Sequence, residues 1–485
     1  MDIKKFRDGF TNFVTLALKP LILILVVTTI GASLKYFTKI ESGFIVTALI
    51  TALTVALGWV LLKKDKIKNQ YKIIIVLLWG MIIRILWLIN IDSIPVSDFR
   101  TIFDSAKLLA EGDPSMMHGN AYIARFPHLT MMVVYMSFMI KTFQDPLIAM
   151  KIVNLFMGVS VIFLIYLIVK EVFESKKYGL IGALIAAIFP PLVTYTSVFC
   201  TENIAIPFYL LGIYLFLLAC KKKVPKYMFL LAGGALSVGH LFRMVAMVLA
   251  FAFVLYIAIY YNDTVKEKIK AILMVVISFM LVLGIASFTL KGLGITENQL
   301  WKGAEPSITN ILKGTNIKHN GAWNEEDAKV PDECNYDYDA INKKAREIII
   351  ERFKTTPITD WIPFYIQKYA TQWSEGDLSG IFWAQLDVPE EGIKIDFFKG
   401  GRGAFQLIYT IIMILVFIGL FNKKRYKEKP EINLFYIGFC GYGLAYLVTE
   451  MQSRYSYIVC WLFIILAISG VEKLREVYLD KKSIK

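Results

Sequence analysis

Long apolar blocks constrain this chain more than any other feature of its sequence. Blocks such as 20–37, 73–91 and 271–290 each approach the roughly 20 residues that a helix needs to cross a bilayer. Apolar residues make up 56% of the chain and charged residues only 19%, which excludes a soluble enzyme, a disordered chain and a small disulfide-rich scaffold. The blocks are continuous rather than alternating, so they also argue against a transmembrane β-barrel.

Thirteen blocks of this kind can be counted along the chain. They lie at 20–37, 44–62, 73–91, 128–143, 148–169, 179–197, 203–220, 227–241, 244–261, 271–290, 402–421, 432–449 and 455–471. Connections rich in Lys and Arg stay in the cytoplasm, and the clearest are 63–72, 221–226 and 422–431. Two cytoplasmic connections must be separated by an even number of crossings, yet five blocks lie between the first two.

The number of crossings becomes even if the block 128–143 does not span the membrane. It is the shortest, it follows Pro127, and Lys141 lies near its end. We therefore interpret it as a juxtamembrane helix that lies on the outer face of the membrane. About twelve spans remain, so we expect an all-α polytopic membrane protein with both termini in the cytoplasm.

The net charge of +14 fits this topology. The segments assigned to the cytoplasm hold 29 basic and 12 acidic residues, at 1–19, 63–72, 170–178, 221–226, 262–270, 422–431 and 472–485. The outer loop 291–401 has 13 basic and 18 acidic residues. The positive charge is therefore an orientation signal, and we expect no nucleic-acid partner.

The topology divides the chain into four parts. Residues 1–72 form an N-terminal two-helix segment. Residues 73–290 form a transmembrane core whose first outer loop, 92–147, carries a candidate catalytic acid. Residues 291–401 form a large extracytoplasmic loop, and residues 402–485 form the C-terminal helices and a cytoplasmic tail.

The large outer loop is long enough to hold a small folded unit. The stretch 338–353 has helical spacing, with Ile341, Ala345, Ile348 and Ile349 on one side. The stretch 357–373 is rich in aromatic residues, which favour the membrane interface.

Two acidic residues at the predicted outer surface are candidates for chemistry. Asp98 closely follows the third block, where it can act as a general base for an acceptor hydroxyl or only cap the helix that begins there. Glu202 lies between two apolar blocks, where an unpaired acid is costly. It is either an N-cap partner of Thr201 or a ligand for a substrate hydroxyl or a metal, facing Asp98. The sequence requires no cofactor, and a divalent cation held by the two carboxylates stays open.

Two arginines fall at predicted outer turns. Arg243 and Arg454 can each extend to the interface and do nothing else, or they can bind a phosphate group through the guanidinium fork. Their convergence on the face that carries Asp98 and Glu202 favours phosphate binding. Arg84 lies in the middle of a span and needs a partner that the sequence does not name.

The order of these features is more specific than any one of them. It comprises Asp98 after a span, Phe126-Pro127, Phe189-Pro190-Pro191 before Thr201-Glu202, Gly-His-Leu-Phe-Arg at 239–243, a large outer loop, and a closing Arg454-Tyr455. This order resembles the C-type (GT-C) glycosyltransferases of membranes. It is most similar to the protein mannosyltransferase and aminoarabinose transferase group, glycosyltransferase family 39, in a bacterial version.

The resemblance implies a GT-C-like transmembrane fold and assigns roles to individual residues. It implies that Asp98 and Glu202 are catalytic. Including one lysine from the large loop, the substrate-binding candidates are Arg243, Arg454, Tyr455, His240 and Lys368.

The function implied is that of a lipid-carrier-dependent glycosyltransferase. It would move a sugar from a polyprenyl-phosphate donor to an acceptor hydroxyl on a cell-surface glycan, lipid or protein, at the outer face of a bacterial plasma membrane. Two alternatives stay open: a transporter or flippase of lipid-linked glycans, and a polymerase or ligase. The sequence has no GxxxxGK[ST] motif, so ATP-driven transport is unsupported.

Overall fold

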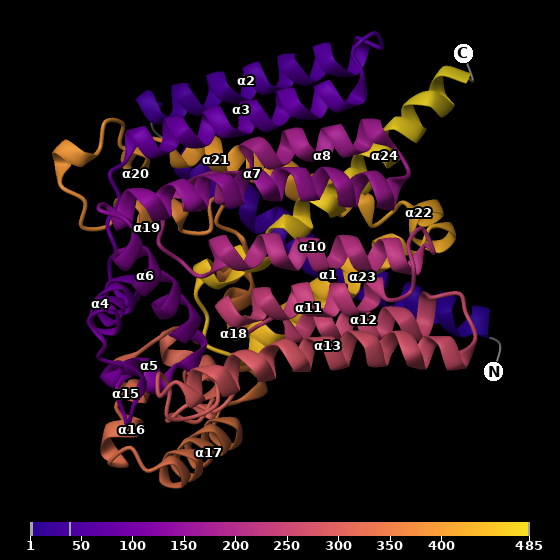
Figure 1. The fold of residues 1–485 in the computed structure, drawn as a ribbon. Helices are drawn as coiled ribbons and strands as arrows, with labels where there is room; N and C mark the ends of the chain where they lie inside the picture. The colour runs from indigo at the N-terminus through magenta and orange to yellow at the C-terminus, as the bar shows by residue number, and fades with distance from the viewer. Residues whose placement is uncertain (1–2, 38–39, 484–485) are drawn as a thin grey trace.

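The computed structural model describes residues 3–37 and 40–483, and within these ranges the chain is built from helices and turns without a β-strand. One isolated antiparallel bridge joins Ile91 to Ile393. Most helices run along a common direction and form a bundle, while shorter helices gather at one end of it (Figure 1). The prediction of an all-α polytopic protein is confirmed.

The bundle contains thirteen of the described helices. They are α1 (Ile3–Tyr36), α2 (Ser42–Lys63), α3 (Asn69–Asn90), α7 (Pro146–Phe173), α8 (Lys176–Ile188), α9 (Pro190–Thr194), α10 (Glu202–Cys220), α11 (Met228–Phe242), α12 (Met247–Tyr260), α13 (Val265–Gly292), α21 (Arg402–Gly419), α23 (Glu431–Val448) and α24 (Trp461–Ser483). Within it α10 packs on α7 and α11, α11 on α13, and α1 on α21.

Each of the twelve predicted spans corresponds to a helix or a broken helix. Eight helices in the described ranges are long and apolar enough to cross a membrane. Two more spans are bent pairs, one formed by α8 and the segment after it, the other by η6 (Ser453–Val459) and α24. The last two predicted spans coincide with the apolar helices α11 and α12, which have only 15 and 14 residues, so their crossing of the membrane stays a prediction.

The predicted juxtamembrane block forms a separate helix, α6 (Thr130–Thr142). It follows a bend of 111° at Phe126, so it does not continue the direction of the segment before it. It packs against α4 (Asp98–Glu111) and α7. A membrane-surface position for α6 stays a prediction.

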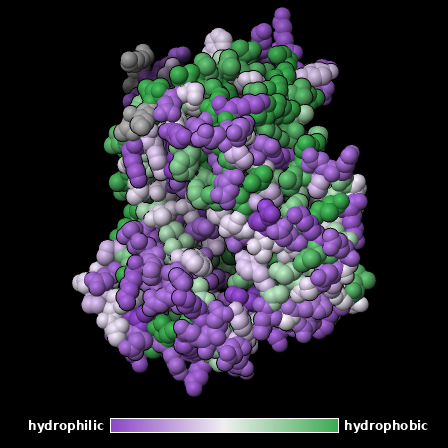
Figure 2. Space-filling view, turned by 90° about the vertical axis from the view of Figure 1, so that its left-hand side faces the viewer, coloured by the Kyte–Doolittle hydropathy of each residue, from purple (hydrophilic) through white to green (hydrophobic). Residues whose placement is uncertain are grey.

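The basic connections gather at one end of the bundle. In Figure 1, α1 begins and α24 ends at the right, where α22 (Lys423–Glu428) and the connection between α2 and α3 also lie. The helix α4 and the large loop lie at the left. Figure 2 looks onto this left-hand end, where hydrophilic side chains cover most of the lower surface and hydrophobic ones gather at the top. The basic connections and the large loop thus lie at opposite ends of the bundle, and the side of the membrane that each end faces stays a prediction.

The site end is built from short helices. They are α4, η1 (Ser115–Met117), α5 (Tyr122–Arg125), η2 (Pro127–Leu129), α14 (Ile308–Gly314), η4 (Ile317–His319), α15 (Glu325–Ala328), α16 (Val330–Glu333), α17 (Tyr338–Thr355), α18 (Ile358–Trp373), α19 (Gly380–Gln385), η5 (Glu390–Gly392) and α20 (Phe397–Gly400). The predicted helix at 338–353 is confirmed as α17, and its Ile341 and Ala345 pack with Leu312 and Val330 in a small core of the large loop.

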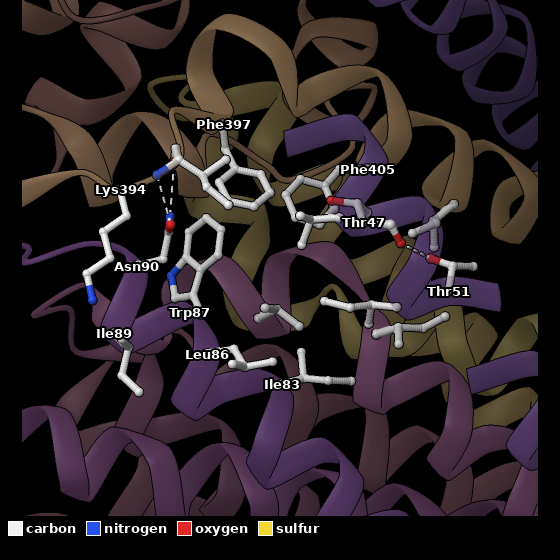
Figure 3. Close-up of a pocket in the computed structure, with 16 residues that line it drawn as sticks. Thr47, Thr51, Ile83, Leu86, Trp87, Ile89, Asn90, Lys394, Phe397 and Phe405 are labelled. Atoms are coloured by element: carbon white, nitrogen blue, oxygen red, sulfur yellow. Dashed lines mark hydrogen bonds between the residues drawn. The ribbon is translucent and has the colours of Figure 1, made fainter. Parts of the chain in front are cut away.

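An apolar cavity of about 260 Å³ lies between α2, α3 and α21 (Figure 3). Trp87, Phe397 and Phe405 line it. Beside it, the Asn90 side chain makes two 3.0 Å hydrogen bonds with the backbone of Ile395. This pair of bonds fixes the end of the large loop to the end of α3.

The break after α8 explains the buried Arg84. Pro190 and Pro191 have no backbone N–H, so the carbonyls of Ala186 and Ala187, four residues earlier, have no helical donor. Arg84 of α3 supplies donors instead: Nη2 lies 3.5 Å from the Ala186 oxygen and Nη1 lies 3.4 Å from the Ala187 oxygen. Nη1 also donates to the Gly80 carbonyl of α3 at 3.1 Å. The guanidinium therefore links α3 to the broken end of α8, whose axis differs by 57° from that of the next helical segment.

A glycine makes room for this guanidinium. Arg84 is fully buried, and among the described residues no carboxylate pairs with it. In α7, a Cβ atom added at Gly158 would lie only 2.7 Å from Nε of Arg84. A side chain larger than glycine at position 158 would therefore push Arg84 away from the Ala186 and Ala187 carbonyls.

We expect Gly158→Ala to lower the free energy of unfolding by about 1–3 kcal/mol, because the added methyl group overpacks the site of Arg84. Gly284→Ala in α13 is the matched control, since a Cβ atom there meets nothing within 4 Å. The control is expected to be neutral or stabilising by up to about 1 kcal/mol. Reversible unfolding in detergent micelles measures both, and equal effects would contradict the role given to Gly158.

Candidate active site

A cavity of about 760 Å³ lies at the site end, between the bundle and the large loop. Its lining is mixed polar and apolar, and it contains both predicted acids and both predicted arginines. The walls come from segments 97–102, 122–129, 201–202, 243–245, 305–328 and 446–455, together with Trp383. Segments distant in the sequence thus meet around one space.

Asp98 is the first residue of α4 and is held at both carboxylate oxygens. Oδ1 accepts a hydrogen bond from the Tyr122 hydroxyl at 3.0 Å, and Oδ2 accepts one from Nη2 of Arg454 at 3.2 Å. The side chain is 44% exposed, so it is accessible in the cavity. The preceding residue, Ser97, has φ of 49°, a left-handed conformation that is uncommon for a residue with a side chain. Both bonds of Asp98 go to side chains outside α4, and the N-cap of the helix is Ser97 without a side-chain capping bond, so the capping alternative is not supported.

Glu202 is the first residue of α10 and is almost fully buried. Its Oε1 lies 3.4 Å from Nε of Arg243, and its Oε2 accepts a 2.9 Å hydrogen bond from the Thr201 hydroxyl. The next residue, Asn203, fixes this turn by donating to two backbone carbonyls of the segment before α10, both at 2.8 Å. The interaction with Thr201 that the sequence offered as an alternative is present, together with an ion pair to Arg243.

The two arginines lie on either side of an aromatic ring. The Tyr455 ring centroid is 5.2 Å from the guanidinium carbon of Arg243 and 5.7 Å from that of Arg454. Arg454 also lies 4.6 Å from the ring of Trp383. In the described chain, Nε and Nη1 of Arg454 and Nε of Arg243 have no hydrogen-bond partner. Nε of Arg243 still faces Oε1 of Glu202 at 3.4 Å, whereas the two Arg454 nitrogens face no acceptor among the described residues, which is costly for buried donors.

The structure does not place the other two predicted substrate-binding residues at the cavity. The ring of His240 is buried and packs against Phe279 at 5.1 Å between ring centroids. The ammonium group of Lys368 donates to the carbonyls of Gly314, Leu447 and Thr449 at 2.6, 2.8 and 2.7 Å. All three of its donors are used, so none is free to bind a phosphate group.

Lys368 instead links α18 to two segments beside the cavity, the end of α14 and the end of α23. The turn after α23 carries Glu450 and Arg454. Burial lowers the pKa of Lys368 to about 8, and the Glu450 carboxylate opposes this shift. The ammonium form therefore predominates at neutral pH. One turn later, Gln372 binds the Gln452 carbonyl at 2.9 Å.

Three further groups of the cavity were not singled out from the sequence. Tyr122 orients Asp98, as described above. Arg125 and Glu305 form a close ion pair at 2.9 Å, and Lys313 lies 3.5 Å from Glu450. Each pair joins a residue of the large loop to another part of the chain, so no local sequence pattern predicts it. Tyr122 is different, because a tyrosine in the same outer loop as Asp98 could have been considered as its hydrogen-bond donor.

The cavity has no ready metal site. In the parts of the chain that the structure describes, no group of three or more His, Cys, Asp or Glu side chains is placed to hold a metal ion. The four acids in the lining, Asp98, Glu202, Glu305 and Glu450, each face a cationic side chain. The two carboxylates considered as cation ligands are thus engaged by arginines.

Replacing Lys368 by Met is expected to lower the free energy of unfolding by at least about 3 kcal/mol, because three carbonyls lose their donor. Lys318→Met is the control, since Lys318 lies exposed on the same loop. Unfolding in detergent micelles compares the two variants with the wild-type protein. A loss for Lys368→Met no larger than for the control would show that the three bonds do not stabilise the loop.

Part of the chain matches a known family. Residues 128–287 match the model of the dolichyl-phosphate-mannose-protein mannosyltransferases. The matched segment includes Glu202 and Arg243, whereas Asp98 and Arg454 lie outside it. A search of curated protein sequences finds no match.

Solved structures give further similarities. The oligosaccharyltransferase AglB from Archaeoglobus fulgidus, in complex with an inhibitory peptide and a dolichol-phosphate, is 13% identical over 86% of this chain, with a TM-score of 0.47. ArnT from Cupriavidus metallidurans, bound to undecaprenyl phosphate, is 12% identical over 83% of this chain, with a TM-score of 0.32. The similar region spans about half, 52%, of the archaeal protein and 77% of ArnT. The predicted resemblance to the protein mannosyltransferase family is confirmed by the match over residues 128–287.

Proposed function

We propose that this protein is a membrane glycosyltransferase that moves a sugar from a polyprenyl-phosphate donor to an acceptor hydroxyl, at the outer face of the plasma membrane. One observation carries the proposal. A half-exposed carboxylate, Asp98, and two arginines, Arg243 and Arg454, converge in one cavity, and two nitrogens of Arg454 have no hydrogen-bond partner in the described chain. The match of residues 128–287 to a mannosyltransferase family supports it.

The arginines suit the phosphate of the donor. When the bond between the sugar and the phosphate breaks, negative charge grows on the phosphate oxygens, and donors already placed there stabilise the transition state. Nε and Nη1 of Arg454 have no hydrogen-bond partner in the described chain, and Arg243, paired with Glu202, adds a second positive charge beside them. Tyr455, which lies between the two arginines, limits how far either guanidinium can move.

Asp98 suits the acceptor. It takes the proton of the acceptor hydroxyl as that oxygen forms a bond to the anomeric carbon. The bond from this carbon to the phosphate oxygen breaks, and its electron pair leaves with the polyprenyl phosphate. Attack from the side opposite the leaving group inverts the anomeric centre. Tyr122 and Arg454 orient the carboxylate for this step.

The distribution of charge supports a site on the outer face. Basic connections gather at the end of the bundle far from the cavity (Figure 1), and such connections stay in the cytoplasm. The polyprenyl chain would then remain in the outer leaflet while its phosphosugar enters the cavity.

Replacing Asp98 by Asn is expected to lower transfer at least about 100-fold, because the amide has nearly the same shape but cannot take a proton. Asp104→Asn is the matched control on the same helix. The carboxylate of Asp104 pairs with Arg100 and Lys107 at the surface and is outside the cavity lining. The measurement is the mass of surface glycans, lipids and proteins in cells that lack the gene and carry each variant.

If cells carrying Asp98→Asn show surface glycans, lipids and proteins of wild-type mass, the proposal is wrong. A transporter predicts another result, namely movement of a labelled polyprenyl-linked sugar across liposomes without a new glycosidic bond. Reconstituted wild-type protein distinguishes the two.

Arg243→Gln and Arg454→Gln are each expected to weaken the binding of undecaprenyl phosphate about 10- to 100-fold, the range expected when a charged hydrogen bond is lost. The lysine variants keep the charge and should lose less. Arg100→Gln, at an exposed position, should bind as the wild-type protein does. Titration of the full chain in nanodiscs gives the dissociation constants, and unchanged affinity in both glutamine variants would refute the phosphate role.

A further inference from the structure

Part of the cavity wall is formed where the large loop meets the turn after α23. The two segments are in close backbone contact. The Met451 amide donates to the Gly321 carbonyl at 2.7 Å, and a Cβ atom at Gly314 would lie 2.3 Å from the Val448 oxygen. Side chains from both segments therefore line the same part of the cavity. We call this part the seam, and it comprises Asn310, Lys313, Trp323, Glu450 and Gln452.

Trp323 leaves its indole open at the seam. It is 61% exposed although it lines a cavity. Three other tryptophans of the large loop, Trp361, Trp373 and Trp383, are at most 8% exposed. A broad aromatic face beside polar groups gives a ligand both an apolar surface and directional contacts.

The polar groups of the seam offer hydrogen bonds rather than net charge. Oε1 of Gln452 is buried and has no hydrogen-bond partner in the described chain. The Asn310 side chain is exposed, with an amide that can both donate and accept. The two charged groups, Lys313 and Glu450, lie 3.5 Å apart and balance each other.

This combination fits a carbohydrate. A sugar ring has a face of C–H groups that stacks on an indole and hydroxyls that both donate and accept. A phosphorylated or strongly acidic acceptor would require unpaired positive charge at the seam, where the one lysine is already paired with Glu450.

We propose that the seam is a saccharide-binding subsite and that the acceptor is a sugar hydroxyl of a glycan, rather than a protein side chain or a lipid headgroup. This inference rests on the proposed function. Because the seam and Asp98 line one cavity, a saccharide stacked on Trp323 can present a hydroxyl toward the carboxylate.

Binding is tested without the donor. Full-length protein in nanodiscs is applied to an array of neutral oligosaccharides, and the saccharide retained most tightly is then titrated. Trp323→Ala is expected to weaken its binding at least tenfold, while Trp323→Phe keeps most of it. Trp301→Ala is the control, since Trp301 is 53% exposed on the same loop but does not line the cavity.

The results separate this inference from the proposed function. Retention of no saccharide by the wild-type protein, or equal binding by Trp323→Ala, overturns the subsite even if sugar transfer is observed on a protein or lipid. Asp98→Asn is measured by sugar transfer rather than by binding, because Asp98 itself meets the acceptor hydroxyl in the proposed mechanism. If that variant still transfers sugar, the proposed mechanism fails while saccharide binding stands.

Discussion

The ammonium group of Lys368 binds three backbone carbonyls, and the geometry of the cavity depends on this contact. Two of the carbonyls belong to the end of α23 and its turn, and the third belongs to α14 of the large loop. The turn carries Glu450 and Arg454, so a shift of the lysine would move the arginine that holds Asp98. Lys368, which is buried outside the cavity, thus determines where Glu450 and Arg454 lie inside it.

Charge balance is the second constraint on the cavity. Each of its four carboxylates faces one cation, and Asp98 differs from the others in being half exposed. Glu202 and Glu305 are only 3% exposed and hold Arg243 and Arg125 in place. The acids therefore divide into one that is accessible to a substrate and others that orient cations.

Local signals predicted the helices and part of the site. The length of an apolar block depends on neighbouring residues only, so each predicted span could be placed on a helix or a broken helix, and eight of the described helices are long and apolar enough to cross a membrane. The positions of Asp98 and Glu202 at the ends of spans followed from the same signals. The partners of Arg84 and Lys368 did not, because they are backbone carbonyls that become available only when distant helices pack. For the same reason, Lys368 was predicted to bind substrate, whereas its ammonium group binds backbone carbonyls of α14 and of the end of α23.

Arg84 contacts the carbonyls at the end of α8 that Pro190 and Pro191, at the start of α9, leave without helical donors, so these three positions are energetically coupled. Without the prolines, backbone amides would compete for the same carbonyls, and the buried arginine would keep the Gly80 oxygen as its acceptor. Without the arginine, two carbonyls would lack donors. Either change made alone therefore leads to a less stable protein, and the cost of each depends on the other.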